Sequence, residues 1–415
     1  MKKYGILFCT AILMTMGCDD SSNNDDNTFI KATQTFQGNI ESVRAIDNTN
    51  IPTALVVASK AKKACIVEFN GKSFDEKDCL TIEETNDDRE FTNSAVLNAS
   101  QFAVTHTLLS KDSSGKTTSC DGEVIFYDTN TKQKTQVTVG SMPDAIAISP
   151  NKKYAITADE HDSNAEAWGK CTIEDIKPSV SIIDLSEGIE KAHVVKTIQF
   201  SKNSLGPREP EYVAIASDND TVAVTLQDSH EVAIFSLKDV LATNEDILDE
   251  SHTSISKLPP NDAGANPWPD GITAFDANGK HCFAIAGEWN DTLILIDNSG
   301  KTLANIRITE REVPTNFPCI DDNESPRYSP DSVTSFTQND RVYVAATLRF
   351  AGAVIVYDVT DPNNPAFYRI DAVGENDVTG CSEEGSKVYP EGISSTQGAV
   401  WTANEGDDSI TYIHY

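Results

Sequence analysis

Five segments of the chain share one pattern, a proline, an acidic residue and then alternating apolar residues. They are Pro143–Ile148, Pro210–Ile215, Pro269–Ile272, Pro330–Val333 and Pro390–Ile393, and their acids lie 67, 59, 61 and 60 residues apart. Each segment is followed by a second apolar run, a polar loop and a third apolar run. Period-two alternation broken by turn residues indicates β-strands, and a four-stranded unit repeated at nearly constant spacing predicts a β-propeller.

Two weaker units precede these five, one from Glu41 to Ile46 and one from Asn93 to Leu97. Five plus two units predict an all-β, seven-bladed propeller of four-stranded antiparallel blades over residues 31–415. The last unit stops after its third strand, at Tyr415. We therefore expect residues 32–38 to supply the missing strand, so that N- and C-terminal strands close the ring and leave no exposed sheet edge.

The charge of the chain limits its partners. It has 33 Lys and Arg against 64 Asp and Glu, a net charge of −31. This balance argues against nucleic acid, which needs basic patches, and against docking on anionic lipid headgroups. It favours cations, a cationic partner or simple solubility, and we expect a monomer.

The N-terminal residues have the pattern of an export signal. Met1–Lys3 is basic and residues 4–16 are apolar, so we expect a signal peptide over residues 1–17. Gly17-Cys18 resembles the bacterial lipoprotein signal, which implies lipidation at Cys18; the alternative is an ordinary signal with a chance cysteine. Residues 18–30 would form an acidic tether to a membrane of the bacterial cell envelope. The sequence does not indicate which membrane of the envelope holds the anchor.

The remaining seven cysteines fit an exported protein, because disulfides persist in oxidising compartments. Cys65 and Cys79 flank a turn, which predicts a hairpin disulfide. The other two predicted pairs tie insertions of successive units, Cys120 with Cys171 and Cys319 with Cys381. Seven is odd, and Cys282 lies in an apolar stretch, so we expect Cys282 to be free.

In a propeller the start of each inner strand opens on one face of the central channel. The repeated acids should therefore ring that face, and the candidate metal ligands are Asp144, Glu211, Asp270, Asp331 and Glu391. The loops between second and third strands open on the same face. Their candidate ligand-binding residues are His106, Glu160, His161, Glu288, Trp289, Arg349 and Glu405.

Two interpretations of the acidic ring stay open. Converging carboxylates repel unless a cation lies among them, and an oxygen-rich, thiol-free site suits Ca²⁺. Alternatively, each carboxylate accepts hydrogen bonds from backbone N–H groups of the neighbouring blade and acts as a structural clasp.

The repeat also resembles known families. The stretch from Val139 to Leu185 looks like the repeat of YVTN-type seven-bladed propellers. The stretches 206–237 and 389–415 look like choice-of-anchor I propellers of bacterial surface and exported proteins, and the resemblance covers roughly residues 90–415. It implies the fold but leaves activity open, because propellers host enzymes and binding proteins alike.

Two functions compete. One is a lipid-anchored binding or scaffold protein that uses its acidic channel face for a protein or small-molecule ligand, with a bound divalent cation. The other is a metal-dependent hydrolase of the lactonase or phosphoesterase kind, in which carboxylates hold a metal that activates water.

Overall fold

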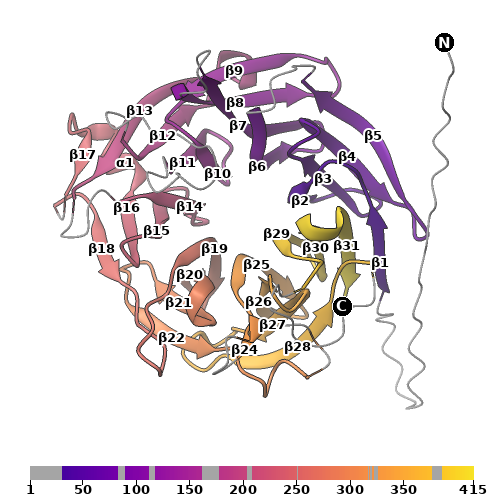
Figure 1. Cartoon of the computed structure of the whole chain (residues 1–415). Coiled ribbons are helices and arrows are strands. Elements are labelled where there is room, and N and C mark those ends of the chain that lie inside the picture. The colour runs from indigo at the N-terminus through magenta and orange to yellow at the C-terminus, as the bar shows by residue number, and fades with distance from the viewer. Residues whose placement is uncertain are drawn as a thin grey trace, which may run out of the picture.

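The computed structural model is a ring of sheets around a central channel (Figure 1). It describes residues 30–82, 89–111, 117–160, 177–202, 208–249, 251–315, 317, 320–321, 326–375 and 386–415. The seven-bladed, all-β propeller predicted from the repeat is confirmed. Residues 1–29, with the predicted signal and Cys18, lie outside the described part of the chain.

Each blade runs outward from the channel through four antiparallel strands. The inner strands are β2 (Ile40–Ile46), β6 (Arg89–Asn98), β10 (Pro143–Ile148), β14 (Pro210–Ile215), β19 (Pro269–Ala277), β25 (Pro330–Gln338) and β29 (Pro390–Thr396). The second strands are β3 (Thr53–Ala58), β7 (Gln101–Lys111), β11 (Tyr154–Asp159), β15 (Thr221–Leu226), β20 (Lys280–Gly287), β26 (Arg341–Leu348) and β30 (Ala399–Asn404). These two layers contain many of the fully buried residues.

The third and outer strands complete the blades. The third strands are β4 (Lys63–Phe69), β8 (Thr117–Asp128), β12 (Ser179–Asp184), β16 (Glu231–Ser236), β21 (Thr292–Asp297), β27 (Ala353–Asp358) and β31 (Ser409–His414). The outer strands are β5 (Phe74–Thr81), β9 (Lys134–Val139), β13 (His193–Phe200), β18 (Ser254–Lys257), β22 (Thr302–Arg307), β28 (Ala366–Ala372) and β1 (Ile30–Thr35).

A few short elements decorate this ring. A fifth strand, β17 (Ile247–Leu248), pairs in parallel with β13, and β23 (Ile320–Asp321) pairs with β24 (Pro326–Arg327). The α-helix α1 (Leu237–Ala242) follows β16. Among the described helices, none is long and apolar enough to cross a membrane.

An N-terminal strand closes the ring as the sequence predicts, but it covers Ile30–Thr35 and not residues 32–38. Strand β1 pairs antiparallel with β31, from Ile30 opposite His414 to Thr35 opposite Ser409. Trp401 of β30 is fully buried at this junction, with its ring 5.6 Å from that of Phe74 and 4.8 Å from that of Tyr412. Strand pairing therefore ties β1 to the last blade, and the aromatic packing of Trp401 ties the first blade to the last.

The repeated proline marks a β-bulge. Five inner strands (β10, β14, β19, β25 and β29) shift register just after their proline. A bulge bends the strand and re-aims the side chains beside it. Neighbouring inner strands also pack closely at two glycines near these bulges. A Cβ on Gly271 would lie 2.7 Å from the backbone of Asp331, and a Cβ on Gly392 would lie 2.7 Å from the backbone of Glu41, so both positions require glycine.

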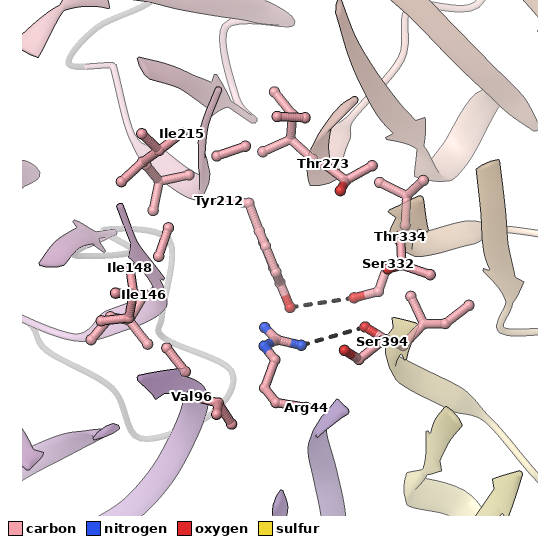
Figure 2. Close-up of a pocket in the computed structure, with 18 of the residues that line it drawn as sticks. Arg44, Val96, Ile146, Ile148, Tyr212, Ile215, Thr273, Ser332, Thr334 and Ser394 are labelled. Atoms are coloured by element: carbon pink, nitrogen blue, oxygen red, sulfur yellow. Dashed lines mark hydrogen bonds between the residues drawn. The ribbon is translucent and has the colours of Figure 1, made fainter. Parts of the chain in front are cut away.

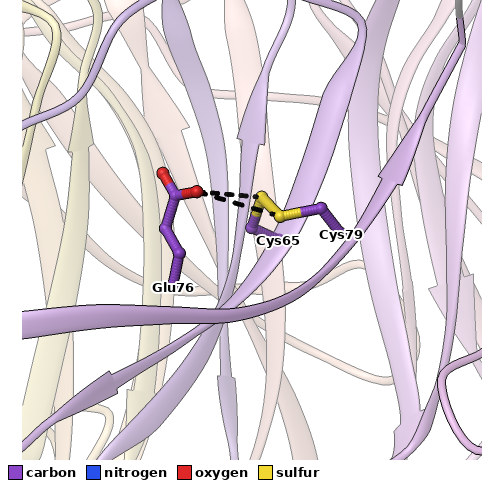
Figure 3. Close-up of side chains that lie close together, drawn as sticks. All are labelled: Cys65, Glu76 and Cys79. Carbon is purple, nitrogen blue, oxygen red and sulfur yellow. Dashed lines mark hydrogen bonds between the residues drawn. A yellow bond between two sulfur atoms is a disulfide. The ribbon is translucent and has the colours of Figure 1, made fainter. Parts of the chain in front are cut away.

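The disulfide expected in the first blade is present. Cys65 on β4 and Cys79 on β5 are directly opposite each other and bonded (Figure 3). The Glu76 carboxylate lies 3.8 and 3.9 Å from the two sulfurs. Because both thiols are consumed, we do not interpret this trio as a metal site.

The other cysteines are only partly described. Cys120 is disulfide-bonded, and its predicted partner Cys171 lies outside the described residues. Cys319 and Cys381 also lie outside them. Cys282 is free and buried, as predicted, and burial raises the pKa of its thiol to about 11.

Candidate cation site at the channel mouth

The acids of the repeat gather at one end of the channel. Glu211, Asp270 and Asp331 are buried, and each is the second residue of its inner strand. Asp144 and Glu391 are half-buried at the equivalent position. Burial raises the pKa of Glu211, Asp270 and Asp331, and the charges of neighbouring acids, Asp144 among them, raise each of these pKa values further.

Three buried carboxylates come closest together. Oxygen atoms of Asp270, Glu288 and Asp331 all lie within 4.8 Å of one another. Asp270 and Asp331 begin the inner strands of two neighbouring blades. Glu288 begins the short 3₁₀-helix η3 (Glu288–Asn290) that follows β20. The structure thus combines two residues of the predicted metal set with one predicted as a ligand-binding residue.

Ion pairs of Arg349 connect this cluster with the following blade. Its Nη1 lies 2.7 Å from Glu288 Oε1 and 3.1 Å from Asp331 Oδ2, and its Nη2 lies 2.7 Å from Glu391 Oε1. Its guanidinium also lies 4.3 Å from the ring centre of Tyr389. One side chain from the loop after β26 therefore spans three consecutive blades.

The carboxylates at the mouth are difficult to ionise together. Burial raises the pKa of Asp270 well above its usual range, and the charges of Asp331 and Glu288 raise it further. Burial raises the pKa of Asp331 to about 7, although Arg349 opposes the shift. Burial and the charge of Glu160 raise the pKa of Glu211, whose Oε2 is buried and has no hydrogen-bond partner among the described residues.

Two acids in the loops that follow the second strands bind backbone donors across a junction between blades. Asp291 Oδ1 accepts hydrogen bonds from the backbone N–H groups of Tyr328 (2.8 Å) and Ser329 (2.9 Å) in the next blade. Asp408 Oδ1 accepts one from Asn39 (2.6 Å) across the ring closure. Both acids directly follow a 3₁₀-helix, η3 or η4 (Glu405–Asp407), in a left-handed conformation. Asp291 and Asp408 therefore form structural clasps between blades, in loops next to the repeated acids.

The other predicted ligand-binding residues are dispersed. His106 lies inside β7, not in a loop, because that strand continues to Lys111, and its Nδ1 lies 2.8 Å from Glu123 Oε1. Glu405 Oε1 accepts a hydrogen bond from Asn39 Nδ2 (2.8 Å). Trp289 is 42% exposed, with the Arg327 guanidinium 5.5 Å from its ring. His161 lies outside the described residues.

Two channel residues were missed by the sequence reasoning, Arg44 and Tyr212. Arg44 Nη2 donates to Asn93 Oδ1 (2.6 Å), and Asn93 Nδ2 donates to the Tyr212 hydroxyl (3.2 Å), so the two side chains meet across the channel. The repeat carried a signal for Tyr212. The other four segments have Ala, Gly, Ser and Gly at its position.

The family comparison agrees with the repeat. Residues 45–207 match the family model of the choice-of-anchor I domain. The match begins upstream of the stretch on which the resemblance was based and ends before its C-terminal motifs. No curated protein sequence matches the chain significantly.

Solved structures of the same shape include enzymes. Virginiamycin B lyase from Staphylococcus aureus superposes with a TM-score of 0.58 at 12% identity, covering 93% of this chain and 99% of that one. A periplasmic gluconolactonase from Pseudomonas aeruginosa gives 0.56 at 12% identity, covering 90% and 91%. A putative 6-phosphogluconolactonase from Bacteroides fragilis gives 0.54 at 11% identity, covering 95% and 92%. At these identities the likeness shows the fold alone.

Proposed function

We propose that this propeller is a binding protein whose channel mouth holds a divalent cation and presents it to a protein or small-molecule ligand. The observation that carries the proposal is the trio Asp270, Glu288 and Asp331, three buried carboxylates whose oxygens lie within 4.8 Å of one another. Two like charges about 4 Å apart repel by about 4 kcal/mol in such surroundings. A cation among them removes that repulsion.

The charges at the mouth favour a cation even after Arg349 is counted. Arg349 contacts Glu288, Asp331 and Glu391, yet Asp270 and Glu211 also lie in this cluster, so five carboxylates share one guanidinium. Glu211 Oε2, which has no hydrogen-bond partner among the described residues, adds a further carboxylate oxygen to this end of the channel. The excess of negative charge is what a divalent ion would neutralise.

The number of carboxylates at the mouth favours Ca²⁺ over Mg²⁺. Ca²⁺ binds oxygens at about 2.3–2.6 Å, so oxygens on opposite sides of the ion lie up to about 5 Å apart. Mg²⁺ binds at about 2.1 Å, which limits that separation to about 4.2 Å. Oxygens that lie within 4.8 Å of one another are compatible with either ion, and Ca²⁺ is favoured because it takes about 6–8 oxygen ligands, whereas Mg²⁺ usually keeps several of its waters.

The test is calcium binding by calorimetry after the protein has been stripped with a chelator. Added Ca²⁺ should raise the melting temperature by mass action, by the equivalent of about 2.7 kcal/mol at one hundred times Kd. Asp270→Asn with Asp331→Asn should abolish the rise, whereas Glu187→Gln, an exposed acid of the third blade, should leave it intact. A wild-type protein that binds no Ca²⁺ would refute the proposal.

A metal-dependent hydrolase of the lactonase kind is the second candidate. In this candidate the carboxylates of Asp270, Glu288 and Asp331 would hold a metal that activates a water for attack on the substrate. The solved neighbours show that lactonases use this fold. Hydrolysis of gluconolactone, measured with Ca²⁺ and with chelator, tests this candidate, and turnover unaffected by Asp331→Asn would count against it.

We also propose that the chain is exported and lipid-anchored through Cys18, on the strength of the Gly17-Cys18 signal. Expression in a bacterium with labelled palmitate should label the wild-type protein and not Cys18→Ala. Equal membrane association of the two proteins would contradict the anchor.

A further inference from the structure

A cavity of about 340 Å³ lies in the channel, and all seven inner strands contribute to its wall. One side of the wall is apolar and the other carries hydroxyl groups (Figure 2). The apolar side chains include Val96, Ile146, Ile148 and Ile215, and the hydroxyl side chains include Thr273, Ser332, Thr334 and Ser394. A ligand that fits both sides has an apolar body and polar groups.

Arg44 brings a positive charge to this cavity. Its guanidinium donates to Ser94 O (2.8 Å), Val43 O (3.0 Å), Ile393 O (3.4 Å) and Asn93 Oδ1 (2.6 Å), all of them neutral oxygens. No ion pair joins it to a carboxylate within the described part of the chain, whereas Arg349 at the mouth contacts three. These bonds fix the guanidinium in place but leave its charge uncompensated by a close anion.

Tyr212 places a second polar group beside Arg44. Its hydroxyl lies 3.4 Å from Ser332 Oγ (Figure 2). The same hydroxyl lies 3.2 Å from Asn93 Nδ2. A phenol hydroxyl and a guanidinium next to each other form a common arrangement for holding a carboxylate. We propose that the channel binds a small monocarboxylate, with its carboxylate at Arg44 and Tyr212 and its apolar body against Val96, Ile146 and Ile148.

This proposal is separate from the cation at the mouth. The carboxylates of the mouth repel an anion in the channel, so a cation bound there would strengthen rather than replace the attraction of Arg44. Binding is therefore measured both with Ca²⁺ and with chelator. We expect the channel to bind a carboxylate in preference to neutral or cationic analogues both with Ca²⁺ and with chelator.

The probe is hexanoate, with hexan-1-ol and hexylamine as neutral and cationic analogues of the same length. Calorimetry should show hexanoate binding at least tenfold more tightly than either analogue. Ile148→Phe, which reduces the cavity without touching the charge, should weaken hexanoate binding severalfold. Equal affinity for the three compounds, or no hexanoate binding at millimolar concentration, would overturn the proposal.

Variants of the two polar groups locate the carboxylate. Arg44→Met should lose more than tenfold in hexanoate affinity, Arg44→Lys should stay within about threefold of wild type, and Tyr212→Phe should lose a few-fold. If Arg44→Met fails to fold, the proposal is still tested by the affinities of Arg44→Lys and Tyr212→Phe for hexanoate, together with the wild-type affinities for hexanoate, hexan-1-ol and hexylamine. Wild-type affinity in both Arg44→Met and Tyr212→Phe would place the ligand elsewhere.

Discussion

Arg349 Nη2 lies 2.7 Å from Glu391 Oε1 although the two residues belong to different blades. Through Nη1 the same guanidinium contacts Asp331 in its own blade and Glu288 in the preceding one. Arg349 is thus the only cation among the described residues that pairs with these three carboxylates. The stability of this end of the ring depends on the balance between its one positive charge and the acids around it.

Replacement of Arg349 by Met should destabilise the protein by about 3–5 kcal/mol, because it leaves buried carboxylates without a partner. Arg349→Lys keeps the charge and should lose clearly less. Urea unfolding measures both variants. A bound divalent cation would recover part of the loss, so the melting temperature of Arg349→Met should respond to Ca²⁺ more strongly than that of wild type. A neutral effect of Arg349→Met would show that the acids are already protonated.

The stability of the metal-free protein should decrease as the pH rises from 5 to 8. The pKa of Asp331 is raised by burial from 3.8 to about 7, so the folded protein binds more protons than the unfolded chain in this range. Stability falls with pH wherever the folded state binds more protons. Asp331→Asn cannot ionise and should show a shallower decrease, whereas Glu187→Gln should match wild type. Thermal scans across pH measure this, and stability that rises from pH 5 to 8 would contradict it.

Removal of β1 should open the ring. A chain that begins at residue 37 lacks the six residues that pair with β31, which exposes the β31 edge of the last blade. A chain that begins at residue 30 retains β1 and serves as the control. We expect the melting temperature to drop by roughly 5 °C or more only in the shorter chain. Equal melting temperatures would mean that β1 contributes nothing to closure.

Loss of the Cys65–Cys79 disulfide should cost about 3 kcal/mol, because the cross-link closes a loop of 14 residues in the unfolded chain. The double change to Ala should show this in urea unfolding. Cys282→Ala, which removes a free buried thiol, should lose less and should not change the effect of a reductant. A double variant as stable as wild type would indicate that the unfolded chain is already restricted there.

The clasp at Asp291 should be structural. Asp291→Ala leaves the N–H groups of Tyr328 and Ser329 without their acceptor, at an expected loss of about 2–4 kcal/mol. Asp291→Asn retains a side-chain oxygen and should stay close to wild type. Asp291→Asn should also leave Ca²⁺ binding unchanged, because Asp291 is not one of the three carboxylates of the trio. A loss of Ca²⁺ affinity in Asp291→Asn would show that Asp291 belongs to the cation site.

The sequence determined the architecture through local patterns. Alternation and turn residues specify strands, and the repeat spacing specifies the number of blades. The missing strand of the last unit specifies closure by an N-terminal strand, because an unpaired edge is unfavourable. The Cys65–Cys79 pair was likewise readable, since the two residues flank one hairpin turn.

The arrangement within the channel was decided by the tertiary structure. The repeat placed Asp270 and Asp331 at the same depth, but only the packing of neighbouring blades brought Glu288 between them and Arg349 across three blades. Arg44 and Tyr212 come from strands 168 positions apart and meet through Asn93. Periodicity gives the height of a side chain in the ring, whereas distances across the axis depend on the bulges and close contacts that set how the blades pack.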